Sequence, residues 1–403
     1  MLNKNTDKEC NQLARDKQNM KNTPKLARPT WIEIDLSRLS SNIGEIKRFL
    51  GPGVKLLAVV KADAYGHGAY EISKAALQNG ASMLGVASLD EGLYLRSRGI
   101  ESPILILGYT DPAYNDLLIE HNLTPTILSL DSAYSLSREA EKRDRKVPVH
   151  VKLDTGMGRL GVSNIDEALL FVQNITSLPG IYVEGIYTHF ASAEEEDSSY
   201  TIFQLNLFKA IIRACEENGI KIPVKHVANT AAALRITQAH FDMVRVGIGL
   251  YGYSPSGELG SSVNLHPVLS WKTKIIFLKQ VAAGTPISYG RTYVAPEKTS
   301  IATVPLGYGD GFNRHLSNRG NLLVKGIRVP VIGSICMDLT MLDVGNVPSV
   351  KEGDECIIIG SQQGNSIFAD EIARNLGTIS YEVLCSINQR IPRFYYNGIT
   401  SNQ

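Results

Sequence analysis

The sequence predicts an α/β protein, with an eight-stranded parallel (β/α)8 barrel followed by a mostly antiparallel β domain. Two patterns lead to this expectation. From residue 55 to about residue 250, short apolar runs alternate with longer, more polar segments of helical character. After about residue 266, short β-type runs follow one another between glycines. The length of 403 residues also exceeds one ordinary domain and favours a barrel plus a second domain.

The barrel strands are expected at eight apolar runs: residues 56–60, 83–87, 104–107, 125–128, 148–153, 182–188, 223–228 and 243–246. The segments between them, such as residues 69–80 and 131–142, have helical character, with Asp131 as an expected N-cap. Continuous apolar strands alternating with helices are typical of parallel strands that helices cover. Eight such units most simply close into a TIM-like barrel.

The second domain is expected from runs such as "LSWKTKIIFLKQV" and "GNLLVKGIRVPVIGSICMD", with one clear helix in "ADEIARNLG". We therefore expect a disordered polar leader over residues 1–28, the barrel over residues 29–265 and the β domain over residues 266–403. The alternating run "WIEIDL" fits a strand of either domain.

Composition excludes several classes of function. Lys+Arg 41 against Asp+Glu 40 gives a net charge of +1, which does not indicate a nucleic-acid partner or a membrane surface. Five scattered cysteines without a C-x-x-C motif indicate neither a disulfide framework nor a zinc site, so we expect no metal. A cytoplasmic protein that acts on a small molecule fits best.

Polar residues gather where the expected strands end, which is where barrels place their active sites. They stand at the ends of the first, fifth, sixth, seventh and eighth strands: Lys61; Lys152 and Asp154; His189; His226, Asn229 and Thr230; Arg245 and Gly247. A lysine whose pKa is lowered by desolvation can form a Schiff base with a substrate carbonyl or with pyridoxal phosphate. Loops after strands seven and eight commonly bind phosphate, which favours the cofactor.

Nine motifs in order resemble the bacterial alanine racemases: "AVVKADAYGHGA", "VKLDTGMGRLG", "THFASA", "HVANTAA", "VRVGIGLYG", "PISYGRTY", "VPLGYGDG", "GSICMD" and "ISYEV". The resemblance runs from about residue 28 to about residue 393. It implies a pyridoxal 5'-phosphate enzyme that works as a head-to-tail homodimer and makes D-alanine for peptidoglycan precursors.

The resemblance also implies roles for individual residues. Lys61 resembles the lysine that holds the cofactor as a Schiff base and serves as one base, and Tyr289 resembles the opposite base, contributed by the partner chain. His189 and Arg245 resemble the groups behind that tyrosine and the cofactor ring. The cofactor-binding set is Lys61, Tyr65, Arg159, His189, Asn229, Thr230, Arg245, Gly247, Ile248 and Tyr381. The substrate-binding set is Arg159, Tyr308, Met337 and Asp338, and Lys152 resembles a lysine that is carbamylated in several members.

Three alternatives stay open at this point. One is racemisation of serine or another amino acid, and a second is a fold-type III pyridoxal-phosphate decarboxylase, although Tyr289 favours racemisation. The third is a non-catalytic pyridoxal-phosphate-binding module, which the second domain argues against.

Overall fold

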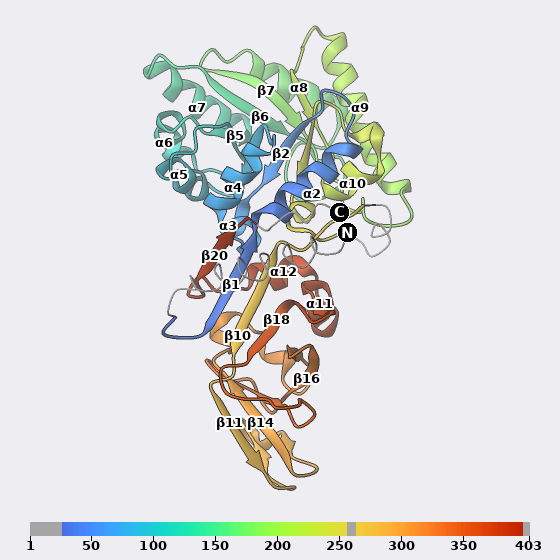
Figure 1. Ribbon diagram of the computed structural model, residues 1–403. Helices are drawn as coiled ribbons and strands as arrows, with labels where there is room; N and C mark the ends of the chain where they lie inside the picture. The colour runs from blue at the N-terminus through green and yellow to red at the C-terminus, as the bar shows by residue number, and fades with distance from the viewer. Residues whose placement is uncertain (1–25, 256–262, 398–403) are drawn as a thin grey trace, which may run out of the picture.

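The computed structural model describes residues 26–255 and 263–397. Most of the expected leader, residues 1–25, lies outside the described residues. The molecule is elongated, with the barrel at one end and the β domain extending away from it (Figure 1). Within the described ranges, no helix combines the length and the apolar character needed to span a bilayer.

The predicted barrel is confirmed, and its strands follow one another in chain order around the sheet. Parallel pairing joins all neighbours from β2 to β8, and β9 pairs with β2. Backbone bonds from Asp242 N–H to Lys225 O (3.1 Å) and from Arg245 N–H to Ala228 O (3.0 Å) connect β9 to β8. The strands are β2 (Lys55–Val59), β3 (Met83–Val86), β4 (Ile104–Ile106), β5 (Thr124–Ile127), β6 (Val147–Lys152), β7 (Ile181–Tyr187), β8 (Val224–His226) and β9 (Met243–Val246).

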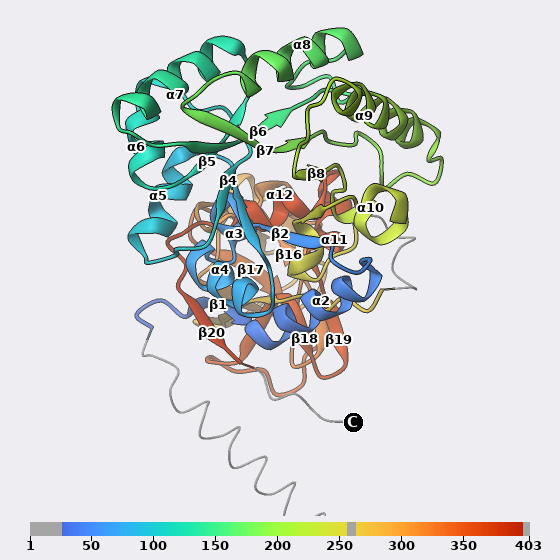
Figure 2. The same ribbon diagram turned by 90° about the horizontal axis from the view of Figure 1, so that it is seen from above.

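Helices surround this barrel, as the view from above shows (Figure 2). They are α2 (Leu36–Phe49), α3 (Lys61–Gly66), α4 (Ala69–Gln78), α5 (Leu89–Ser97), α6 (Asn115–Glu120), α7 (Leu130–Lys142), α8 (Ile165–Thr176), α9 (Ser199–Glu217) and α10 (Thr230–Arg235), with 3-10 turns η1 (Pro112–Tyr114), η2 (Thr237–Ala239) and η3 (Ile248–Tyr251). The prediction of Asp131 as the N-cap is wrong, because the N-cap of α7 is Ser129, two residues earlier, and Asp131 lies in the first turn of the helix. Ser129 caps it by accepting a hydrogen bond from Ser132 N–H.

The β domain is a mostly antiparallel sheet, as predicted. Its order is β11-β14-β17-β16-β15-β18-β10-β1-β20, with β19 beside β18. The run "WIEIDL" forms β1, which pairs with β10 and, in parallel, with β20, so this early strand belongs to the second sheet. The strands are β1 (Thr30–Asp35), β10 (Leu269–Lys274), β11 (Phe277–Val281), β14 (Thr299–Val304), β15 (Asn321–Val324), β16 (Ile327–Ile332), β17 (Thr340–Asp343), β18 (Glu355–Gln362), β19 (Asn365–Ile367) and β20 (Arg393–Tyr396).

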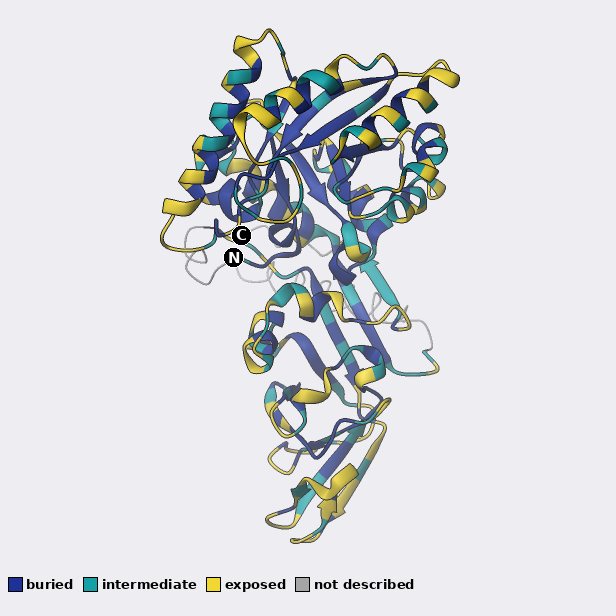
Figure 3. Cartoon of the chain, turned by 180° about the vertical axis from the view of Figure 1, so that it is seen from behind, coloured by how far each residue is buried: buried dark blue, intermediate teal, exposed yellow. Residues whose placement is uncertain are grey.

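Short elements complete this domain: the hairpin β12 (Pro286–Ile287) and β13 (Tyr293–Val294), turns η5 (Tyr289–Arg291), η6 (Tyr308–Asp310) and η7 (Arg314–Leu316), and helices α11 (Ala369–Leu376) and α12 (Ser380–Cys385). One continuous apolar core runs through the barrel and the near part of the β domain, and a smaller cluster lies around Ile301 and Ile332. The buried barrel strands contrast with the largely exposed far end of the β domain (Figure 3). The helix α12 contacts α3, which brings the second domain to the barrel mouth.

Candidate active site

A cavity of about 700 Å³ opens at the carboxyl end of the barrel strands. All ten predicted cofactor-binding residues line it, together with Lys152: Lys61, Tyr65, Arg159, His189, Asn229, Thr230, Arg245, Gly247, Ile248 and Tyr381. They come from five barrel loops and from α12, so only the closed barrel brings them together. Across the described ranges, no group of three or more His, Cys, Asp and Glu side chains is arranged to hold a metal ion.

Lys61 follows β2 directly and starts an unusual turn. The next four residues, 62–65, all have φ of 52–53°, which makes a left-handed helical turn built without glycine. Glu91 braces this turn, because its carboxylate accepts hydrogen bonds from Ala62 N–H and Ala87 N–H, both 2.7 Å long. Burial and the positive charge of Arg159 lower the pKa of Lys61, which favours the neutral, nucleophilic amine.

A polar cradle lies between α10 and η3. Asn229 caps α10, and Thr230 Oγ1 accepts a hydrogen bond from Gly247 N–H (3.1 Å). A Cβ at Gly247 would lie 2.6 Å from Tyr65 Oη, so the glycine keeps the hydroxyl close to the backbone. Two hydroxyls and the backbone N–H groups of a 3-10 turn are a donor set that suits a phosphate group. The site therefore fits the phosphate end of pyridoxal phosphate, and Lys61 fits its aldehyde.

Arg245 lines the same cavity from β9, the strand that pairs with β2, and is buried. Its guanidinium donates to the carbonyls of Thr188 (2.7 Å), His226 (2.9 Å) and Val227 (3.0 Å). It also bonds to His226 Nδ1 at 2.9 Å and to His189 Nδ1 at 3.3 Å. Burial lowers the pKa of Arg245 to about 10, so the group stays charged at neutral pH and donates only.

Lys152 and Arg159 are two further basic residues that line the cavity. The loop that carries Arg159 is shaped by Asp154, whose carboxylate accepts from the four N–H groups of residues 156–159. Lys152 Nζ donates to the carbonyls of Leu153 and Leu160. Burial and the charge of Arg245 lower the pKa of Lys152 to about 7.

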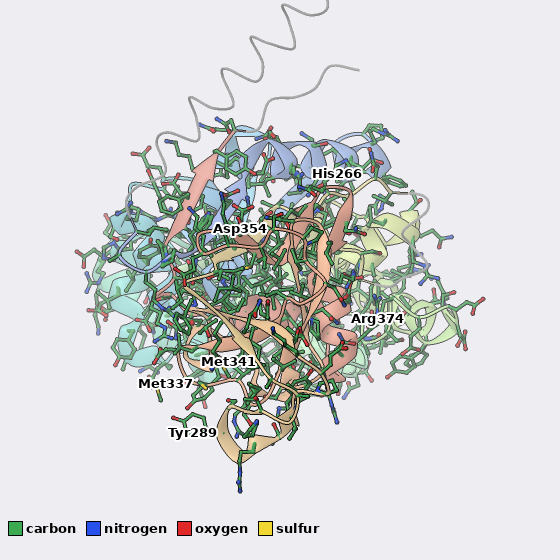
Figure 4. The ribbon with its side chains drawn as sticks, turned by 60° about the horizontal axis from the view of Figure 1, so that its bottom comes forward. His266, Tyr289, Met337, Met341, Asp354 and Arg374 are labelled. Carbon is green, nitrogen blue, oxygen red and sulfur yellow. The ribbon has the colours of Figure 1, made fainter. Side chains whose placement is uncertain are left out.

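Four predicted site residues do not reach this cavity within one chain: Tyr289, Tyr308, Met337 and Asp338. Tyr289 and Met337 lie on the β domain, with their side chains exposed (Figure 4). Tyr289 is 72% exposed, an unusual state for an aromatic side chain of a β domain.

These four residues nevertheless form one cluster. Tyr308 N–H donates to Cys336 O (3.0 Å), and Gly309 N–H donates to Met337 O (2.9 Å). Ser334 Oγ donates to Tyr289 O (2.9 Å), which ties the "SYG" and "GSICMD" motifs together. The chain thus carries two clusters of predicted site residues, one in the barrel and one on the β domain.

The cavity also contains residues that sequence reasoning missed, among them Tyr187, Glu194 and Cys385. The ring of Tyr187 is stacked on the ring of His226, with 4.7 Å between the ring centroids. The Arg245 guanidinium lies 5.1 Å from the centroid of the Tyr187 ring. Tyr187 could have been found, because it is the last residue of β7 and precedes Thr188. Cys385 could not, because α12 comes from the second domain.

Comparisons with known proteins agree with this geometry. The family models "Alanine racemase, N-terminal domain" and "Alanine racemase, C-terminal domain" match residues 34–255 and 268–395. The alanine racemase of Halothermothrix orenii is 47% identical over 375 residues, which cover 93% of this chain and 99% of that protein.

Two solved structures extend the comparison. The alanine racemase of Clostridium difficile 630 superposes with a TM-score of 0.89 at 40% identity, covering 93% of this chain and 97% of that one. The alanine racemase of Bartonella henselae, with covalently bound pyridoxal phosphate, has a TM-score of 0.82 at 27% identity over 91% of this chain and 99% of that one. These matches set aside the decarboxylase and the non-catalytic module. The chain belongs to the alanine racemase family of pyridoxal-phosphate-dependent isomerases.

Proposed function

We propose that this chain interconverts L- and D-alanine with two bases, Lys61 of one subunit and Tyr289 of the partner subunit. The observation that carries the proposal is the separation of the two clusters. Lys61 lines the barrel cavity, whereas the exposed Tyr289 lies on the β domain and is not among the residues that line this cavity. A head-to-tail homodimer would join the two clusters into one site.

In this proposal the barrel domain, residues 29–265, holds the cofactor. The β domain, residues 266–403, whose sheet also includes β1 of the first range, completes the site of the other subunit. Lys61 would attach pyridoxal phosphate covalently, and Tyr65, Asn229, Thr230, Gly247, Ile248 and Tyr381 would hold its phosphate end. When bound, the cofactor supplies an electron sink that acidifies the substrate α-proton. Arg245 would donate to the ring nitrogen, and Arg159 would place the substrate carboxylate.

The two bases would exchange roles between directions. One removes the α-proton from one face while the other delivers a proton to the opposite face. His189, which bonds to Arg245, would stand behind Tyr289 of the partner subunit, and cationic neighbours would favour the phenolate of that tyrosine. Tyr308, Met337 and Asp338 would border the substrate from the partner's side. We further propose a cytoplasmic enzyme that supplies D-alanine for peptidoglycan precursors.

Lys152 is our candidate for carbamylation. A pKa of about 7 leaves much of the amine neutral at neutral pH, and only the neutral amine reacts with carbon dioxide. The carbamate would replace a cation beside Arg159 with an anion that pairs with it. With 13C-labelled bicarbonate, a carbamate NMR signal should be stronger at pH 8 than at pH 6 and absent from Lys152→Ala. A signal that survives in Lys152→Ala would place the carbamate elsewhere.

Racemisation is tested by following α-proton exchange of L-alanine in D2O with proton NMR while chiral chromatography measures D-alanine. Exchange accompanied by D-alanine is expected. Parallel reactions with L-serine and L-lysine decide the substrate. Faster turnover of either one than of alanine would contradict the proposed substrate, and cofactor binding without exchange of any of the three would contradict racemisation.

A further inference from the structure

A line of buried polar side chains runs from Arg245 through the barrel interior to Glu184. Arg245 Nη1 bonds to His226 Nδ1 at 2.9 Å, and His226 Nε2 lies 2.8 Å from His150 Nδ1. His150 Nε2 then lies 3.4 Å from Glu184 Oε2. Both imidazoles are completely buried, and the Glu184 side chain is 31% exposed, so the line ends at the rim of the barrel.

The two ends of this line, Arg245 and Glu184, determine which ring nitrogen of His226 and of His150 carries the proton. A guanidinium only donates hydrogen bonds, so His226 Nδ1 must be the bare acceptor and His226 Nε2 must carry the proton. His226 Nε2–H then donates to His150 Nδ1, which leaves His150 Nε2–H pointing at Glu184. Burial lowers the pKa of both imidazoles, which keeps them neutral as this arrangement requires.

The line also connects the buried positive charge of Arg245 to a carboxylate. A buried guanidinium is costly unless an anion compensates it. Within the described residues, the hydrogen-bond partners of Arg245 are three carbonyls and two imidazoles, with no carboxylate among them. Glu184 is the anion at the end of its hydrogen-bonded line, and polarised imidazoles carry part of that charge inward.

The surrounding backbone is adapted to this line. The pairing of β6 with β7 shifts register between Val149 and His150, which sets His150 opposite Gly185. A Cβ at Gly185 would lie 2.5 Å from the His150 ring, so only glycine leaves room for the imidazole. On the other side, the stacked ring of Tyr187 covers His226.

We propose that Glu184 is a positioning residue that acts through His150 and His226 to hold Arg245 as a fixed donor in the active site. Glu184 touches neither substrate nor cofactor. Its carboxylate locks both imidazoles as Nε2–H tautomers, and the bare Nδ1 of His226 then orients the guanidinium. The consequence for turnover depends on the proposed racemase function, whereas the tautomers themselves do not.

The test uses protein labelled with 15N only in histidine, first without cofactor. In the wild type, the signals lost in His150→Asn and His226→Asn should report an unprotonated Nδ1 and a protonated Nε2. Glu184→Gln removes the charge and should shift or split these signals. Gly185→Ala should do the same with Glu184 intact, because it displaces the His150 ring. Glu139→Gln removes a carboxylate of similar exposure that pairs with Lys142 and Arg143 on α7, and should change nothing.

With cofactor and alanine, Glu184→Gln should lower kcat about tenfold and leave KM unchanged, because the line does not touch the substrate. A wild-type imidazole that is Nδ1–H or doubly protonated would overturn the proposal. So would unchanged tautomers in Glu184→Gln, or changed tautomers with unchanged kcat. A protein that fails to racemise alanine at all would contradict the proposed function while the cofactor-free spectra still decide the tautomer lock.

Discussion

Arg245 is a buried cation, and in the proposed site it stands where many pyridoxal enzymes place a carboxylate. In the proposed site it keeps the ring nitrogen unprotonated, which limits electron withdrawal and disfavours transamination. Replacing it with a carboxylate should reverse this preference.

Arg245→Glu should therefore raise the ratio of transamination to racemisation of alanine. Pyruvate formation and D-alanine formation, measured in the same reaction, give this ratio. Arg245→Lys, which keeps a cationic donor, should leave the ratio closer to that of the wild type. An unchanged ratio in a folded, cofactor-loaded Arg245→Glu variant would argue against the role given to this residue.

Individual site residues could be predicted where polar side chains interrupt an apolar strand end, as at Lys61, His189 and Arg245. The same reasoning fails for Glu184 and His150. They lie inside strands, where a polar residue between apolar ones resembles ordinary alternation, and their connection depends on a register shift that the sequence pattern does not reveal.

At the scale of elements, the left-handed turn after Lys61 carries conformational strain over four successive residues, 62–65. Left-handed backbone costs roughly 1–2 kcal/mol per residue without glycine. The packing of α3 against α12 holds it in place, since a Cβ at Gly66 would lie 2.4 Å from Leu384 O. Helical propensity alone would make residues 61–66 right-handed, so the sequence could predict a turn here but not its hand.

Gly66→Ala should lower the free energy of unfolding by about 3 kcal/mol, which combines positive φ with a backbone clash. Gly53→Ala is the matched control, because Gly53 has φ of +79° against +78° for Gly66, and no atom lies within 4 Å of its added Cβ. The control should lose about 1 kcal/mol. Urea unfolding of the cofactor-free proteins measures both values, and equal losses would show that α12 does not hold the turn.

The existence of a strand was easier to predict from the sequence than the sheet to which the strand belongs. All eight barrel strands were predicted from their apolar runs, because strands buried on both faces leave a continuous signal. The strand β1 was not assignable to a domain, because its alternation is local information while its partners β10 and β20 are more than 200 residues away in sequence.

Across the whole molecule, Asp310 ties two segments that are far apart in sequence, around Arg28 and Arg390, to the β-domain cluster. This buried carboxylate pairs with Arg28 (2.5 Å) and Arg390 (2.8 Å), and Arg390 also bonds to Asp338 (2.9 Å). Burial alone would raise the pKa of Asp310, but the two arginines and Gly307 N–H outweigh it and lower the pKa. The network thus fixes the loop that carries Met337 and Asp338.

Asp310→Asn should destabilise the protein by about 3 kcal/mol at pH 7, because it leaves two arginines around an uncharged group. The lowered pKa means that the carboxylate stabilises the fold above its unfolded pKa, and that this contribution disappears as pH falls through its folded pKa. The difference from wild type in urea unfolding should therefore shrink in acid. Asp370→Asn, at an exposed ion pair with Arg374, should cost less than about 1 kcal/mol at any pH.

The central claim is that each active site takes Lys61 from one subunit and Tyr289 from the other. Lys61→Ala and Tyr289→Ala chains should each be inactive alone. Mixed, unfolded and refolded together, they should recover about one quarter of wild-type activity, because half of the dimers are mixed and each has one intact site. Lys61→Ala mixed with the Lys61→Ala/Tyr289→Ala double variant has no intact site and should stay inactive. No recovery in the first mixture, with mixed dimers confirmed by mass spectrometry, would contradict the shared site.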